Sequence, residues 1–297
     1  MSHYASLSKK PAGKVVKYFG AMLCTYIIIN NFKSLNMKRI LFFSAITLSL
    51  FSSCKKDDPT YNSNVKGALT VEFDNIVGTA DLQLNTANYT NASGESFKIS
   101  KMKYYVSNFK LTAADGSVYT VPQDSSYFLI EEGITGKAKL SVPEGEYTRI
   151  SFVLGVDSLR NTMDLSKRTG VLDPGAAASE MYWGWNSGYI FLKLEGTSPA
   201  VITADHMFMY HSGGFGGYSA PTPNNLKTIS LDLTARGTPK VLQSKTTNIH
   251  LMADALKILN GSTNFSFATV AMIHSPAAGT PLANNYANMF THDHTEN

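Results

Sequence analysis

Apolar and polar residues alternate at every second position along much of the chain from Gly67 onward, a pattern that places successive side chains on opposite faces of a sheet. Leu69, Val71 and Phe73, for example, are separated by Thr70 and Glu72. The pattern predicts further strands at 81–84, Lys103–Thr112, Ser117–Val121, Lys139–Val142, Tyr147–Leu154, Tyr189–Glu195, Thr228–Leu233 and Asn248–Met252. A short helix is predicted over Ala253–Leu259, before Asn260-Gly261.

Clusters of turn-forming residues separate these strands, among them Asp115-Gly116, Pro143-Glu144-Gly145 and Ser219–Asn225. Many short strands and almost no long helix indicate an all-β protein, specifically an antiparallel β-sandwich with long loops and at most one or two short helices. A hydrophobic content of 43% and a charged content of 16% are sufficient for a folded core. The predicted domain covers residues 67–297.

The N-terminal region has the features of a secretory signal. Met37-Lys38-Arg39 precedes the apolar run Ile40–Phe51, and small residues then lead to Cys54. We therefore expect residues 37–53 to be a lipoprotein signal peptide, Cys54 to carry the lipid and residues 54–66 to form a polar tether. Residues 1–36 are interpreted as an upstream extension. This arrangement predicts an outer-membrane lipoprotein on the periplasmic face or the cell surface; the alternative, a membrane span over residues 18–32, is short and contains two asparagines.

Charge and cysteine content restrict the possible ligands. Seven of the 26 basic residues and none of the 22 acidic ones lie in residues 1–53, so the remainder has 19 basic residues and a net charge of −3. A mildly acidic body does not favour nucleic-acid binding. The two cysteines are Cys24 and Cys54, so the predicted domain has no thiolate ligand. A metal would need histidine, methionine, carboxylate or a modified aromatic side chain.

Six histidines follow Cys54, and their spacing suggests two candidate metal sites. His292 and His294 would face the same way in an extended strand and could hold one ion, unless they belong to a polar tail. In the segment before the glycines, Met207, Met209 and His211 would share one face of a strand, a donor set suited to Cu(I). Core packing is the favoured interpretation of the two methionines. The remaining histidines are His206, His250 and His274.

Aromatic and glycine-rich segments are the other notable features. Trp183 and Trp185 either close one end of the sandwich, form a stacking platform or line a metal pocket. The glycines of Ser212–Gly217 precede no predicted helix, so they indicate close approach of the backbone to a neighbouring group and not a phosphate site. The sequence has no Gly-x-Ser-x-Gly elbow and no His-Glu-x-x-His helix, and no enzymatic activity is predicted.

Several stretches, in this order, resemble the MbnP-like family of periplasmic copper-binding proteins, in its Bacteroidetes lipoprotein branch. The Met-x-Trp-x-Trp stretch with the strand after it is the most specific of them. The stretches are Lys103–Asn108, Val142–Tyr147, Phe152–Ser158, Met181–Tyr189, His211–Gly214 and Asn285–Phe290.

The resemblance implies a β-sandwich that binds copper through histidines and, in some relatives, through a tryptophan oxidised to kynurenine. Trp183 matches that tryptophan, and His211 matches the family's His-x-Gly-Gly stretch. Trp185 stands where a relative has a second histidine, so one imidazole is missing. His292 and His294 match a histidine-bearing C-terminus.

Together these features predict a lipid-anchored, extracytoplasmic, non-enzymatic protein that binds copper. The predicted ligands are His211, His274, His292 and His294, with Trp183 if it is oxidised, converging on one ion. Ligation needs neutral imidazole, so binding should weaken as the pH falls through about 6.5. The alternative is a surface module that binds glycan or protein without metal and uses Trp183, Trp185 and Tyr189 as its platform. The expected partner is the membrane, through the lipid anchor at Cys54, and the sequence does not identify a protein partner.

Overall fold

A computed structural model describes residues 60–297 of the chain. The predicted upstream extension, the signal peptide of residues 37–53 and the lipidation site at Cys54 lie outside the described residues. Within residues 60–297, the helices lack the length and apolar character that a membrane span requires.

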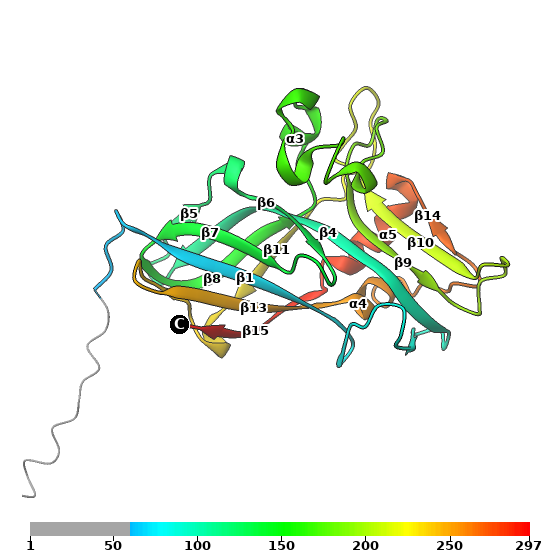
Figure 1. Cartoon of the computed structure of the whole chain (residues 1–297), viewed down its shortest axis with the longest axis horizontal. Coiled ribbons are helices and arrows are strands. Elements are labelled where there is room, and N and C mark those ends of the chain that lie inside the picture. Colours follow the sequence, from blue (N-terminus) through cyan, green and yellow to red (C-terminus); the bar gives the residue numbers. More distant parts are fainter. Residues whose placement is uncertain (1–59) are drawn as a thin grey trace, which may run out of the picture. The chain divides into compact units, whose positions relative to one another are not determined.

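The described chain forms two sheets (Figure 1). The five-stranded sheet contains β15 (Phe290–Glu296), β13 (Thr246–Asp254), β1 (Lys66–Val77), β2 (Ala80–Asp81) and β7 (Lys137–Pro143). The main path of the ten-stranded sheet is β11 (Lys227–Asp232), β8 (Gly145–Leu154), β4 (Ser96–Ala113), β9 (Ile190–Thr197), β10 (Met207–Gly213) and β14 (Met272–Ile273). Its remaining strands are β3 (Tyr89–Thr90), β5 (Val118–Thr120), β6 (Tyr127–Glu131) and β12 (Lys240–Val241). Within residues 60–297 the α-helices are α3 (Ser158–Thr162), α4 (Ala255–Leu259) and α5 (Pro276–Tyr286).

Side chains from both sheets meet in an aromatic core. Phe152 of β8 has its ring centroid 5.7 Å from that of Phe73 of β1, 5.4 Å from Phe109 of β4 and 5.1 Å from Phe290 of β15. Residues of β1 alternate between buried and accessible, as the hydrophobic pattern predicts. Burial of one face of each sheet against the other confirms the all-β sandwich.

The strands are mostly antiparallel, but β1 pairs with β13 and β10 pairs with β14 in parallel. Leu82 and Leu84 follow β2 and belong to no strand, so that strand prediction was wrong. The short helix predicted before Asn260 is present as α4. The sequence pattern missed α5, which has eleven residues.

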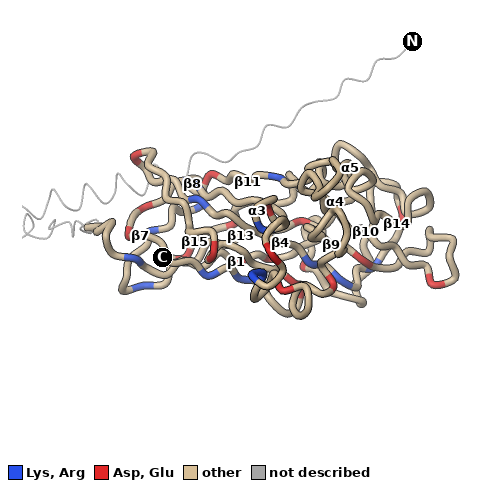
Figure 2. Tube along the Cα trace, turned by 90° about the horizontal axis from the view of Figure 1, so that it is seen from above, with Lys and Arg blue, Asp and Glu red and all other residues tan. Residues whose placement is uncertain are grey.

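Basic and acidic residues are interspersed along the described chain (Figure 2). On β4, Lys103 contacts Glu131 at 2.7 Å and Glu180 at 3.2 Å, and Lys101 contacts Glu180 at 3.0 Å. Glu180 lies in a short 3-10 helix, Ser179–Met181, just before the tryptophans. These ion pairs connect that helix to the outer face of the ten-stranded sheet, where the candidate site lies.

Candidate metal centre

The outer face of β9 and β10 carries polar and soft side chains. His211 lies opposite Lys193, and Met209 lies opposite Glu195. The residues between them on each strand face the core and are fully buried, as Tyr210 is. Met207, Met209 and His211 therefore share one face, as an extended segment predicts. The expectation that the methionines pack in the core was wrong, because their face of the sheet is the outer one and Met207 is 38% exposed.

A carboxylate orients the imidazole of His211. Nε2 of His211 lies 2.7 Å from Oε1 of Glu195. An ionised carboxylate only accepts hydrogen bonds, so Nε2 of His211 carries a hydrogen and donates this hydrogen bond. This hydrogen bond lowers the pKa of Glu195 despite the opposing effect of burial. The tautomer fixed in this way leaves Nδ1 of neutral His211 with its lone pair available for a metal.

His274 places a second imidazole beside the first. It lies between β14 and α5, and its ring centroid is 4.3 Å from that of His211. Nε2 of His274 is buried and has no hydrogen-bond partner among the described residues. Burial and the nearby His211 lower the pKa of His274, so it is neutral at pH 7. A buried imidazole nitrogen without a partner is suited to metal coordination.

Lysines counterbalance Glu195 on the same face. Nζ of Lys193 lies 3.8 Å from Oε1 of Glu195, and Nζ of Lys101 lies 3.9 Å from Oε2. Lys193 is only 6% exposed, and burial lowers its pKa. Glu195 thus interacts with two buried groups: it accepts a hydrogen bond from the imidazole of His211 and faces the ammonium group of Lys193.

A tight loop brings the tryptophans to the end of β10. The backbone N–H of Trp183 donates to the Gly188 carbonyl at 3.0 Å, and the indole rings of Trp183 and Trp185 stack with centroids 4.9 Å apart. A Cβ atom added to Gly213 would lie 2.9 Å from Cζ3 of Trp183 and 2.5 Å from the carbonyl oxygen of Tyr189. The predicted close approach at this glycine is confirmed, and it places Trp183 against the strand that carries His211.

The predicted aromatic platform is only partly present. Trp185 is 44% exposed, but Tyr189 is buried and its hydroxyl donates to the carbonyl of Leu172. Tyr189 cannot stack on a ligand from solution, so its place in the platform was wrong.

The terminal histidines lie elsewhere. His211 belongs to the ten-stranded sheet, whereas His292 and His294 belong to β15 of the five-stranded sheet. Figures 1 and 2 both place β10, β14 and α5 together at one end of the body, away from β15. The hypothesis that all these imidazoles converge on one ion was therefore wrong. His211 pairs with His274, whereas His294 pairs with His250, which was not a predicted ligand, and His292 belongs to neither pair.

Comparisons with known proteins identify the family. A family model described as MbnP matches residues 66–275. The chain belongs to the MbnP family. The solved structure of MbnP from Methylosinus trichosporium is similar, with a TM-score of 0.48 and 19% identity, over 67% of this chain and 83% of that one. No curated protein gives a significant match.

The MbnP match includes Trp183, Glu195, His211 and His274, but it ends before β15. Sequence reasoning missed Glu195, although a signal was present. Lys193 and Glu195 interrupt a strand of otherwise apolar residues, and charged groups in such a strand need a partner. His250 was noted as a histidine but not as a partner of His294, because only the strand register brings the two together.

Proposed function

We propose that this MbnP-family protein binds copper at the His211–His274 pair and acts by binding without catalysing a reaction. One observation carries the proposal: a buried imidazole nitrogen of His274 that has no partner within residues 60–297, beside an imidazole that Glu195 holds in a defined tautomer. His274 supplies the second imidazole that the sequence lacks at position 185. The thioethers of Met207 and Met209 share the outer face with His211, and soft sulfur donors favour copper over harder ions. Anchoring through a lipid at Cys54 is part of the same proposal.

Replacing His211 or His274 with alanine is expected to weaken copper binding by about a hundredfold or more, because even outer-shell partners of metal ligands contribute about 10–100-fold. Titration of the untagged full chain against a chromophoric copper chelator measures the change. His206→Ala is the control. His206 is exposed in the turn before β10, where its Nδ1 lies 2.7 Å from the carbonyl oxygen of Val201. Wild-type copper affinity in both His211→Ala and His274→Ala would reject this ligand pair.

Trp183 is proposed as a further donor after oxidation to kynurenine. Dioxygen cleaves the C2–C3 bond of the indole to give N-formylkynurenine, and water then removes the formyl group as formate. The side chain thereby exchanges one carbon for one oxygen and gains a free aromatic amine. Intact-mass measurement of copper-loaded protein exposed to dioxygen should detect this exchange in the wild type and not in Trp183→Phe. An unchanged mass in the wild type would remove Trp183 from the site without affecting the histidines.

A further inference from the structure

A second group of histidine and carboxylate side chains lies on the outer face of the five-stranded sheet. The strand register places Lys137 of β7 opposite Glu72 of β1, Glu72 opposite His250 of β13, and His250 opposite His294 of β15. Directly opposed residues project from the same face of a sheet. Four neighbouring strands thus form one continuous row of charged and titratable side chains.

A bulge in β15 determines which terminal histidine joins this row. His294 pairs with His250 and His292 pairs with Leu251, so two steps along β15 correspond to one step along β13, and Asp293 is the extra residue. Leu251 is fully buried, which places His292 on the core-facing side, where its Nε2 lies 3.0 Å from Oγ1 of Thr295. His294 therefore faces outward with His250, and the prediction that His292 and His294 face the same way was wrong.

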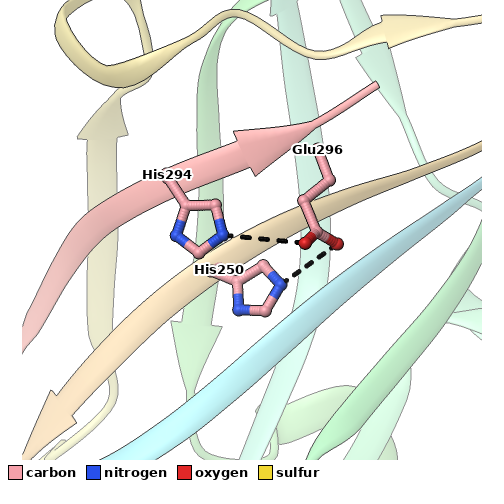
Figure 3. A group of neighbouring side chains, drawn as sticks. All are labelled: His250, His294 and Glu296. Carbon is pink, nitrogen blue, oxygen red and sulfur yellow. Dashed lines mark ion pairs between the residues drawn. The ribbon is translucent and has the colours of Figure 1, made fainter.

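The donor atoms have the spacing of a metal site (Figure 3). Nε2 of His250 lies 3.5 Å from Oε2 of Glu296, and Nε2 of His294 lies 3.9 Å from Oε1 of the same residue. One ligand atom from each of the three residues lies within 4.8 Å of the others. Ligands about 2.0–2.1 Å from a tetrahedral ion lie about 3.3 Å from one another, so only a small contraction is required. The two imidazole rings stack, with centroids 4.2 Å apart and planes at 16°.

The amide of Asn248 indicates where a cation would sit. Its Nδ2 lies 2.8 Å from Oε2 of Glu72, 2.8 Å from Nε2 of His250 and 3.4 Å from Oε2 of Glu296. Three acceptors thus converge on an amide group that has two hydrogens to donate. Oδ1 of the same amide is buried without a hydrogen-bond partner among residues 60–297. Three acceptors face only two amide hydrogens, so one acceptor has no hydrogen to accept, and a cation at this point would bind it. Rotation of the Asn248 amide would then turn its Oδ1 toward the ion.

We infer that His250, His294 and Glu296 form a second metal site, independent of the proposed copper centre, for a divalent transition-metal ion such as Zn²⁺. Two imidazoles and a carboxylate, with no sulfur, favour a divalent ion over Cu(I). Glu72 supports the site from the neighbouring strand, with its Oε2 3.5 Å from Nε2 of His250 and 3.0 Å from Nζ of Lys137. Two of the three ligands come from β15, which lies beyond the segment matched by the family model.

Zn²⁺ titration of the untagged full chain, with a chromophoric chelator as competitor, tests the site. A variant with both His211→Ala and His274→Ala is the starting protein, so that zinc bound at the proposed copper centre does not contribute. We expect this protein to retain one zinc site whose affinity falls by about a hundredfold or more on His294→Gln. His292→Gln is the matched control, because it changes a histidine of the same strand that faces the other way.

Glu296→Gln is the second variant, since Glu296 is exposed at the end of β15 and its replacement leaves the core intact. It should also weaken zinc binding. Unchanged zinc affinity in both His294→Gln and Glu296→Gln, or equal losses in His294→Gln and His292→Gln, would overturn the second site. Either result would leave the copper measurements on His211→Ala and His274→Ala unaffected, so the two proposals fail separately.

Discussion

Glu195→Ala is expected to lower the free energy of unfolding by about 3 kcal/mol and the copper affinity by about 10–100-fold. The carboxylate accepts from Nε2 of His211 at 2.7 Å and lies 3.8 Å from Nζ of the buried Lys193. Its removal leaves the ammonium group desolvated without its nearest counter-charge and frees the imidazole to rotate or change tautomer. Chemical denaturation and copper titration of the same protein samples measure the two effects.

Glu195→Gln separates the hydrogen bond to His211 from the charge interaction with Lys193. The amide oxygen still accepts from His211, so copper affinity should recover more than stability does, because Lys193 remains without its counter-charge. Wild-type stability in Glu195→Ala would contradict the proposed role of the buried ion pair.

The same carboxylate has a defined effect on acid stability. The His211 hydrogen bond lowers the pKa of Glu195 in the folded state relative to its ordinary value of about 4.3. The unfolded chain therefore takes up this proton first as the pH falls. The stabilisation is complete above the ordinary pKa and is lost as the pH falls through the folded-state pKa. Glu195→Ala should accordingly show a shallower loss of stability below about pH 4.3 than the wild type.

The alternation of apolar and polar residues predicted the features that depend only on residues close together in the chain. Alternation along β1 and β8 identified strands and their buried faces, and the same period placed Met207, Met209 and His211 on one face. The predicted crowding holds at Gly213, Gly214 and Gly217, where an added Cβ would overlap a neighbouring atom, but not at Gly216, which has open space around it. For α5, a start signal was present but missed: Ser275 accepts from the Ala278 N–H as the N-cap, and Pro276 follows it.

The sequence pattern could not predict the two histidine pairs, because they depend on the pairing and register of strands that are far apart in the chain. His250 meets His294 because β13 and β15 are neighbours in the five-stranded sheet. On its other side β13 pairs with β1, which comes from a distant part of the chain, so the sequence alone does not reveal this order. A bulge at Asp293 reverses the orientation of His292, and no residue type at that position signals it. His274 reaches His211 because β14 adds to the edge of β10 in parallel, a pairing of two residues with no periodic signal of its own.

Gly213→Ala is expected to lower the free energy of unfolding by about 3 kcal/mol, the upper end of the range for overpacking. Its new Cβ would lie 2.5 Å from the carbonyl oxygen of Tyr189 and 2.9 Å from Cζ3 of Trp183, so either the neighbouring backbone or the indole must move. Displacement of Trp183 would disturb its stacking on Trp185, in which the two ring centroids are 4.9 Å apart. We therefore expect altered tryptophan emission in the folded variant, measured with denaturant unfolding. Since the strand that carries Gly213 also carries His211, copper affinity should fall as well.

Gly145→Ala is the matched control, because Gly145 also lies in a strand and the nearest atom to its added Cβ would be 3.6 Å away, an ordinary contact. This substitution should leave the emission unchanged and stabilise the protein by about 0.4–1 kcal/mol through loss of unfolded-state entropy. If Gly213→Ala matched Gly145→Ala in stability and emission, Trp183 would not pack against β10 as described. The indole would then not lie beside the proposed copper centre, while the contact between His211 and His274 would be unaffected.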